Sequence, residues 1–531
     1  MAIPSLNIGG GKWATKQDKL LAYKQNIGGR YFAIDGDTSR NSTATFTNQN
    51  GLIESVGNNV ARVDFKDDVK GNLLLETQST NLITQSESFV NSYWTKSGAS
   101  IQGDPSTAGV EEVVNGDFAT DTDWSKGGGW TISSGKAIYD GTGGTSSLSQ
   151  TGVIEVDKFY KLSIDVISNE GSGNNTIFLG GFMLNVSHLE VGTHVFYGQT
   201  TNTNVNLNVY GRSGEVFEID NVSVKEVQGF ASPSLDSPTG AFKMVGDISN
   251  SRHNLRAGFT TAVTSTYSLF AKMGELRYLQ LASINTTSQI VNFDLLDGTV
   301  AYLGSSFTDA KITQLVNGWF KLEVTSTNQC NSLYISLISS PTSGWLETWS
   351  MLNNTDGLYI YGAQLEALPY ATSYIPTNGS AVTRVKDVAN NFGDVNTFNS
   401  SEGTLFVEMS ALDNDLDRRI TLSDGTIDNR VSIKWDADST TIKAFMGLNG
   451  LITTAAFNQQ DNLKIVLTFK ENDFKMYING VLIGLDTSAS VLASIDRIDF
   501  SNYNGLNNFY GECKQLQVFK TVLTASEIAN L

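Results

Sequence analysis

The chain has 531 residues, with 36 Lys and Arg against 54 Asp and Glu and a formal net charge of −18. This acidic balance argues against nucleic acid as a partner, because affinity for nucleic acid depends on Lys and Arg neutralising phosphates. Only 17% of the residues are charged and 50 residues are Gly, a composition that favours short strands joined by polar turns.

The length suits about three or four domains of ~150 residues each. No stretch reaches the ~18 consecutive apolar residues of a membrane-spanning helix, so we expect no membrane insertion. The first residues, MAIPSLNIGGGKWATK, lack the basic region followed by an apolar region that marks a signal peptide. We therefore expect a protein that is made in the cytoplasm and is not exported by such a peptide.

The first 85 residues show little regular alternation of polar and apolar residues. We expect an irregular attachment segment over 1–85, with one short helix at Lys16–Tyr23 (KQDKLLAY) and a strand at GNLLLET. A segment that cannot bury its own apolar side chains has to pack elsewhere. The expected partner is a neighbouring domain, a sister subunit or another protein of the same assembly.

One domain opening is interrupted by a second opening of the same kind. Residues 86–98 read SESFVNSYWTKSG and residues 115–130 read NGDFATDTDWSKGGGW, so the second begins before the first can complete a domain. The second unit ends at VFEIDNVSVKEV, and the first resumes near residue 229. We expect a nested domain at 109–227 inside a domain formed by 86–108 and 228–385.

Short segments of alternating polar and apolar residues, typical of half-buried antiparallel strands, fill the three expected domains. In the interrupted domain, strands are expected at 265–272, 276–283, 289–295, 319–326, 332–339 and 357–363. In the nested domain, they are expected at 158–167, 175–185, 193–198, 204–210 and 216–224. In the last domain, 386–531, they are expected at 403–410, 429–435, 463–469, 473–479, 494–500 and 508–518.

The predicted fold class is all-β, with serial antiparallel jelly-roll sandwiches, one of them nested inside another. The exception is a short helix at Thr524–Ala529. There Thr524 is the expected N-cap and Glu527, three residues later, completes a capping box.

Several phrases resemble known families. NLLLETQSTNLITQSESFVNSYWTKSG and GAQLEALPYATSYIPTNGSAVTRVKDV resemble the two ends of a β-domain found in bacteriophage tail and appendage proteins. Residues 113–227, from VVNGDF to EIDNVSVKE, resemble a jelly-roll carbohydrate-binding module. Residues 400–531 resemble the laminin-G/concanavalin-like lectin fold, with FKMYINGVLIG as its hairpin and FKTVLTASEIANL as its closing phrase.

No catalytic pattern is visible, so we expect a protein that is not an enzyme. The sequence has three His residues and contains no G-x-S-x-G, H-E-x-x-H or P-loop pattern. Glycoside hydrolysis needs only two suitably spaced carboxylates, and 54 acidic residues leave such a pair open as an alternative.

Calcium is the metal that the acidic turns would suit. In LDNDLDRR, the residues Asp413, Asp415 and Asp417 supply hard oxygen ligands on a turn, although the spacing is not that of an EF-hand; the alternative is a solvated loop. The resemblance to carbohydrate-binding modules implies a structural calcium ligand at Asp220. The acidic residue that usually follows the first-strand Phe is replaced by Ala119.

Sugar recognition uses aromatic faces against the apolar sides of pyranose rings. Trp130, which follows three glycines, is the first candidate, with Tyr139 beside it in the nested domain. Trp345 and Trp349, in the polar segment TSGWLETWSML, are the candidates in the interrupted domain. The alternative for each of them is a core position.

These features together predict a bacteriophage virion appendage: a tail fibre, spike or head fibre that adheres to host-surface or environmental glycans. Its first 85 residues would attach it to other virion proteins, the resemblance to phage fibres implies a homotrimer, and cell lysis would release it. Two alternatives stay open: a structural virion protein without a ligand, and a polysaccharide-degrading enzyme with accessory modules.

Overall fold

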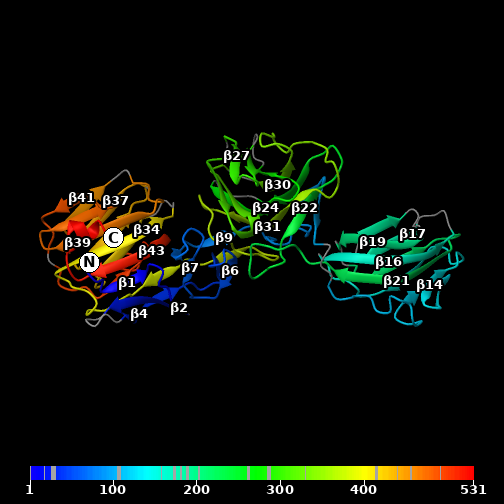
Figure 1. The fold of residues 1–531 in the computed structure, drawn as a ribbon, viewed down its shortest axis with the longest axis horizontal. Coiled ribbons are helices and arrows are strands. Elements are labelled where there is room, and N and C mark those ends of the chain that lie inside the picture. The colour runs from blue at the N-terminus through cyan, green and yellow to red at the C-terminus, as the bar shows by residue number, and fades with distance from the viewer. Residues whose placement is uncertain are drawn as a thin grey trace.

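The computed structural model describes residues 2–16, 18–25, 31–104, 109–156, 158–170, 175–179, 182–186, 191–200, 204–259, 264–283, 289–305, 307–328, 331–412, 417–438, 440–454, 457–490 and 492–531. The predicted all-β class is confirmed, because these residues form antiparallel sheets with little helix. Three sandwiches follow one another along the molecule, and both chain ends lie in the same one (Figure 1).

The terminal domain (residues 2–76 and 387–531) is built from both ends of the chain. The main path of its large sheet runs β33 (Val388–Asn390), β4 (Tyr31–Ser39), β3 (Lys19–Gln25), β1 (Leu6–Gly9), β43 (Gly511–Phe519), β34 (Glu402–Ala411), β39 (Leu463–Lys470), β40 (Phe474–Ile478) and β41 (Val481–Asp486). β2 (Thr15–Lys16), β7 (Arg62–Asp64) and β8 (Asn72–Leu75) pair beside this path.

A second, five-stranded sheet covers the terminal domain's core. Its order is β38 (Gly450–Thr454), β37 (Ile442–Met446), β36 (Arg430–Trp435), β35 (Arg418–Ser423) and β42 (Arg497–Asp499). The helix α1 (Ala525–Ile528) begins at Thr524 with the predicted capping box to Glu527, which is confirmed. No helix among the described residues is long and apolar enough to cross a membrane.

The expectation of an irregular N-terminal segment is wrong. β1 pairs with β43 through Leu6↔Val518 and Ile8↔Leu516, and the expected helix at Lys16–Tyr23 is instead β3, which pairs with β4. Leu6 and Ile8 are fully buried in the core of the terminal domain, as are Leu20 and Ala22. The segment therefore docks on the other end of its own chain, where sheet pairing overrides local helix propensity.

The middle domain (residues 77–104 and 228–386) is a sandwich of two six-stranded sheets. One runs β10 (Thr95–Ser97), β23 (His253–Gly258), β30 (Ser332–Ile338), β25 (Tyr278–Ser283), β26 (Gln289–Asp294) and β27 (Thr299–Leu303). The other runs β11 (Ala99–Gln102), β22 (Phe242–Gly246), β31 (Gly357–Glu366), β24 (Ser265–Lys272), β29 (Trp319–Ser326) and β28 (Asp309–Gln314), with the 3-10 turn η1 (Val316–Gly318) before β29.

The inner domain (residues 109–227) is a sandwich of two five-stranded sheets. One runs β12 (Ser125–Lys126), β15 (Ser146–Gln150), β20 (Leu207–Gly211), β17 (Asn175–Leu179) and β18 (Phe182–Val186). The other runs β13 (Trp130–Ser133), β14 (Lys136–Tyr139), β21 (Phe217–Glu226), β16 (Phe159–Asn169) and β19 (Gly192–Gln199). All strands of both sheets fall between Ser125 and Glu226.

At each of the two domain boundaries, the outgoing and returning chain segments lie side by side. The middle domain begins and ends in the pair of β9 (Ser79–Asn81) and β32 (Val382–Arg384). The inner domain begins and ends where Gly109 N–H donates to the Glu226 carbonyl at 2.7 Å and Asp104 N–H donates to the Gln228 carbonyl at 2.8 Å. Each domain thus starts and finishes at adjacent points, which is the geometry that domain insertion requires.

A buried charge network occupies the junction of the terminal and middle domains. Arg62 binds Glu76 at 2.6 Å and also binds Asp387, and Arg40 binds Asp387 at 3.0 Å. Arg384 lies 3.4 Å from Glu76 and 3.6 Å from Asp387. No side chain of this junction network is more than 6% exposed.

The network also ties the middle domain to the hairpin of β5 (Ala44–Thr47) and β6 (Ile53–Val56). Ser373 N–H donates to Glu76 Oε1 at 2.7 Å, and Arg62 donates to the Thr45 carbonyl at 3.1 Å. Burial alone would raise the pKa of Glu76, but the guanidinium groups of Arg384 and Arg62 hold that pKa well below its ordinary value. Glu76 is therefore an anion in the folded protein.

Removal of residues 109–227, with a short Gly/Ser linker in their place, should leave the rest of the chain folded. The inner domain buries its own core and meets the middle domain at closely paired ends. We expect soluble expression and unchanged melting of the terminal and middle domains by calorimetry. Loss of soluble expression, or a lower melting temperature for those two domains, would contradict the nesting.

The substitution Arg62→Met should destabilise the protein by about 3–5 kcal/mol, because it removes the closest cation of two buried carboxylates, Glu76 and Asp387. Chemical denaturation measures this cost. The matched control is Lys470→Met, which breaks the Lys470–Glu402 pair whose side chains are 57% and 31% exposed. We expect the control to change stability by less than about 1 kcal/mol; equal effects of the two variants would show that the junction network is unimportant.

Candidate functional site

The prediction that Trp130 and Tyr139 form an exposed sugar site is wrong. Trp130 is 5% exposed and Tyr139 is fully buried, and their ring centroids lie 5.2 Å apart. Phe217 packs edge-on against Trp130 at 5.3 Å. The three glycines before Trp130 do form a turn, but Trp130 is the first residue of β13 and points inward, so these rings seal the inner sandwich.

The acidic candidates do not gather into a cluster. Asp220, on β21, accepts a hydrogen bond from the backbone N–H of Asn221 at 2.7 Å, and Asp417 pairs with Lys434 at 2.7 Å. Asp413 and Asp415 lie outside the described residues. Within the described ranges, no group of three His, Cys, Asp or Glu is placed to hold a metal ion. Structural calcium stays a prediction.

Trp349 anchors the loop that follows β30. Its indole N–H donates to the Leu337 carbonyl at 3.3 Å, and its ring packs edge-on against His253 at 5.5 Å. Both ring nitrogens of His253 lie within hydrogen-bond distance of backbone carbonyls, those of Gly98 and Trp349. Trp349 therefore has packing partners on the protein itself and supports the loop.

Trp345, in the same loop, lies on the outer face of the middle domain. It is half-buried, and its ring packs edge-on against Tyr334 with centroids 5.8 Å apart. The guanidinium carbon of Arg256 lies 5.7 Å from the centre of the Tyr334 ring. These three residues, called here the Trp345 platform, combine two aromatic rings with an exposed cationic donor.

The sheet register explains how the platform forms. Leu333 and Ile335 on β30 point into the core, so Tyr334 between them points outward. Arg256 on β23 is directly opposite Tyr334 in the register. The polar residues around Trp345 in the sequence already marked it as a candidate. Arg256 and Tyr334 were missed, although the alternation within 332–339 already puts Tyr334 on the face opposite the core.

Buried amides hold the loop against the sheet. The Gln280 side chain accepts from Leu346 N–H at 2.9 Å and donates to the Gly344 carbonyl at 3.0 Å. The Asn292 side chain donates to the carbonyls of Pro341 and Ser343, each at 2.9 Å. Gln280 and Asn292 are fully buried. Since buried hydrogen bonds are costly to break, the backbone on both sides of Trp345 is fixed before any ligand arrives.

Two further features fix this loop. The Glu347 carboxylate accepts from Ser339 N–H at 2.8 Å and from the hydroxyls of Ser339 and Ser343. Leu346 has φ +41°, which is unfavourable for a branched side chain, and its side chain is 2% exposed in a cluster with Tyr334. Such strain persists only where surrounding contacts impose it, and it is common at binding sites.

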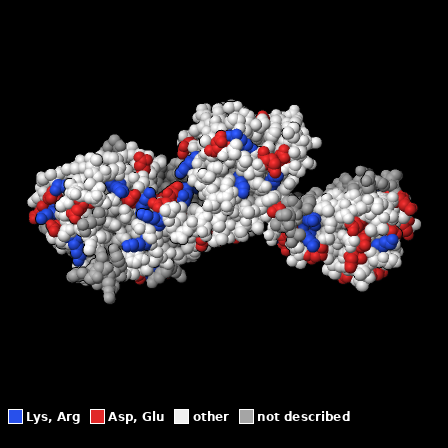
Figure 2. All heavy atoms as spheres, viewed as in Figure 1, with Lys and Arg blue, Asp and Glu red and all other residues white. Residues whose placement is uncertain are grey.

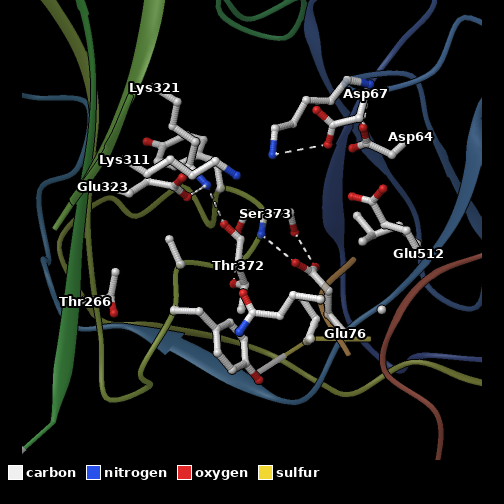
Figure 3. Close-up of a pocket in the computed structure, with 18 of the residues that line it drawn as sticks. Asp64, Asp67, Glu76, Thr266, Lys311, Lys321, Glu323, Thr372, Ser373 and Glu512 are labelled. Carbon is white, nitrogen blue, oxygen red and sulfur yellow. Dashed lines mark hydrogen bonds and ion pairs between the residues drawn. The ribbon is translucent and has the colours of Figure 1, made fainter. Parts of the chain in front are cut away.

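A polar hollow of about 630 Å³ separates the terminal and middle domains (Figure 3). Lys311, Lys321 and Glu323 of the middle domain line one side, and Asp64 and Glu512 of the terminal domain line the other. On the face shown in Figure 2, acidic and basic side chains are mixed at this boundary.

The carboxyl groups of the hollow differ in their proton affinity. Burial raises the pKa values of Asp64 and Glu512. Burial also acts on Glu323, but Lys321 and Lys66 more than offset it and lower the pKa of Glu323. Carboxyl groups that line one hollow and have pKa values shifted in opposite directions can act as an acid and a base.

No protein-family model matches the sequence, and no curated protein matches it. Among solved structures, the CBM40 module of a Ruminococcus gnavus IT-sialidase, bound to α2,3 sialyllactose, is 14% identical with a TM-score of 0.23, covering 27% of this chain and 92% of that one.

Two other solved structures span more of the chain. A carbohydrate-binding protein from Bacteroides ovatus is 14% identical with a TM-score of 0.21, covering 50% of this chain and 79% of that one. The Trypanosoma rangeli sialidase is 9% identical with a TM-score of 0.22, covering 93% and 97%. These neighbours are carbohydrate-binding modules and sialidases, but similarity this low carries no argument about the function of this chain.

Proposed function

We propose that this protein is a non-enzymatic glycan-binding protein and that the Trp345 platform is a site of contact. The observation that carries the proposal is a partly exposed Trp345 ring on the outer face of a β-sandwich, backed by the buried Tyr334 ring, with the exposed Arg256 over Tyr334. A pyranose ring presents an apolar face that stacks on an aromatic ring and hydroxyls that accept from a guanidinium group.

The fixed backbone around Trp345 also supports this proposal. Binding costs less when the contact residues are already ordered, because little conformational entropy remains to be lost. The amides of Gln280 and Asn292 and the carboxylate of Glu347 hold the loop in one arrangement. A free loop of the same composition would lose much of the stacking energy in becoming ordered.

We further propose that the protein is a subunit of a bacteriophage appendage and that cell lysis releases it. It would form a homotrimer, and this homotrimer would attach to other virion proteins. The phrases at residues 72–98 and 362–388 that resemble phage tail and appendage proteins support this proposal. Since β1 of the N-terminal segment pairs within the terminal domain, attachment to other virion proteins would use the surface of the segment that is not packed there. Light scattering of the full chain and labelling of phage particles test this assignment.

A second candidate function is hydrolysis of a polysaccharide in the hollow of Figure 3. The observation that favours it is the opposite shift of carboxyl pKa values there: burial raises that of Glu512, while Lys321 and Lys66 lower that of Glu323 against the effect of burial. Glycosidases use one protonated and one ionised carboxyl group flanking the bond they cleave.

The substitution Trp345→Ala should weaken glycan binding about 30-fold, since a well-placed aromatic anchor contributes ~2 kcal/mol or more. A glycan array finds the ligand, and titration calorimetry measures the affinity. Leu352→Ala is the control, because Leu352 is a large apolar residue close along the chain that is 97% exposed and outside the platform. If both variants bind like the original protein, or if the folded protein binds no glycan, the proposal fails.

The hydrolytic alternative predicts release of reducing sugar from a polysaccharide, with loss of that activity in Glu512→Gln. Reducing-end assays over a panel of bacterial and plant polysaccharides measure it. Glu402→Gln is the control, because it alters a half-exposed carboxylate at the opposite end of β34 from the hollow-lining residues Ser410 and Ala411. Absence of product from every polysaccharide, including those that bind, would leave the non-enzymatic proposal as the better one.

A further inference from the structure

The five-stranded sheet of the terminal domain has an unusually basic outer face. Ile420, Val431 and Ile433 point into the core. The alternating residues therefore point outward, and those that carry a cation or an aromatic ring are Arg419, Arg430, Lys434, Lys443 and Phe445. Such a concentration of cations stands out in a chain with a net charge of −18.

Two of these arginines lie against the same aromatic ring. The guanidinium carbon of Arg419 lies 5.0 Å from the centre of the Phe445 ring, and that of Arg430 lies 4.9 Å from it. Arg430 is also 5.7 Å from the centre of the Tyr503 ring. Stacking on aromatic rings fixes the plane of a guanidinium group, so its N–H donors are held in defined directions.

The other cations of this face have acidic partners. Lys434 binds Asp417 at 2.7 Å and Asp436 at 2.5 Å, and Lys443 binds Asp436 at 2.6 Å. Arg497, on the adjacent strand β42, lies 3.4 Å from Asp496 and 3.5 Å from Asp499. These pairs neutralise the other cations of the face.

Arg419 and Arg430 form no ion pair with any described residue. Nε and Nη1 of Arg419 are buried without a hydrogen-bond partner, and the Arg430 guanidinium makes one long hydrogen bond, from Nε to the Gly447 carbonyl at 3.4 Å. Arg430 is only 8% exposed, and burial lowers the pKa of both guanidinium groups. Arg419 is half-buried and is attracted electrostatically by Asp417 and Asp436. A guanidinium group with so few direct hydrogen bonds is costly to bury, and an anionic ligand that accepts its remaining N–H donors would offset that cost.

We propose that Arg419 and Arg430, held by Phe445 and Tyr503, bind the carboxylate or sulfate group of an acidic saccharide. Two arginines suit one such group, whose oxygens accept several N–H donors at once. A long, highly charged polymer such as nucleic acid is disfavoured by the net charge of −18 on the chain. The saccharide as carrier rests on the proposed glycan-binding function, whereas the anion follows from the two arginines alone.

The test titrates the full-length protein with trigalacturonate as the carboxylate probe, a heparin tetrasaccharide as the sulfate probe and maltotriose as the neutral probe. The double variant Arg419→Gln/Arg430→Gln should lose 10-fold or more in affinity for one acidic probe, as expected on losing hydrogen bonds to a charged group. The probe that binds more tightly identifies the anion. Affinity should fall as salt rises, because ions screen the attraction.

Two controls make the result specific. Arg497→Gln removes a paired arginine from the same sheet and should leave acidic binding unchanged. Arg430→Lys keeps the charge but not the planar donor edge, and should weaken binding even where the double variant proves unstable.

The inference is overturned if the folded protein binds neither acidic probe, or if the double variant binds both as tightly as the original. Acidic binding that is lost in Trp345→Ala but kept in the double variant would also overturn it, while supporting the Trp345 platform. Conversely, a platform that binds nothing leaves acidic binding at Arg419 and Arg430 intact, so the two proposals fail separately.

Discussion

The buried charges at the junction network constrain the whole architecture. The chain passes this point twice, once near Glu76 and again near Asp387, and Arg62 binds both carboxylates. With Arg40 and Arg384, three cations surround two anions away from water. A buried cluster of this kind tolerates few alternative arrangements, because any displaced partner leaves a charge unpaired in a medium of low dielectric constant. The middle domain, which carries the inner domain, is therefore joined to the terminal domain at the junction network.

Much of the fold could be predicted from the sequence wherever a strand carries its own pattern. Segments such as 332–339 and 463–469 alternate clearly and form β30 and β39. The N-terminal strands could not be predicted in this way, because β1 is only four residues long and derives its place from pairing with β43. Nothing local to Leu6–Gly9 distinguishes a strand from an irregular segment; the partner lies at the other end of the chain.

The functional surfaces were predictable only in part, for a related reason. Trp345 could be predicted because an aromatic residue in a polar loop has few apolar neighbours to bury it. The glycines before Trp130 suggested an exposed turn, but Trp130 itself begins β13 and is buried. The arginines at 256, 419 and 430 carry no signal in isolation. Whether each arginine can form a binding site depends on the aromatic ring that it contacts on another strand or loop. Strand register and loop placement decide that contact, not neighbours in the sequence.

The pairing of the first strand with the last also sets the order in which the molecule can be completed during synthesis. Ser5 and Val518 are hydrogen-bonded across 513 residues, so β1 lacks this partner until β43 has been synthesised. At ~5–20 residues per second, this delay is roughly 25–100 s. The inner domain has all its strands long before then, followed by the middle domain. The inner domain can therefore fold first, the middle domain second and the terminal domain last. Until β43 emerges from the ribosome, the edge of β1 that pairs with it is open to misassembly.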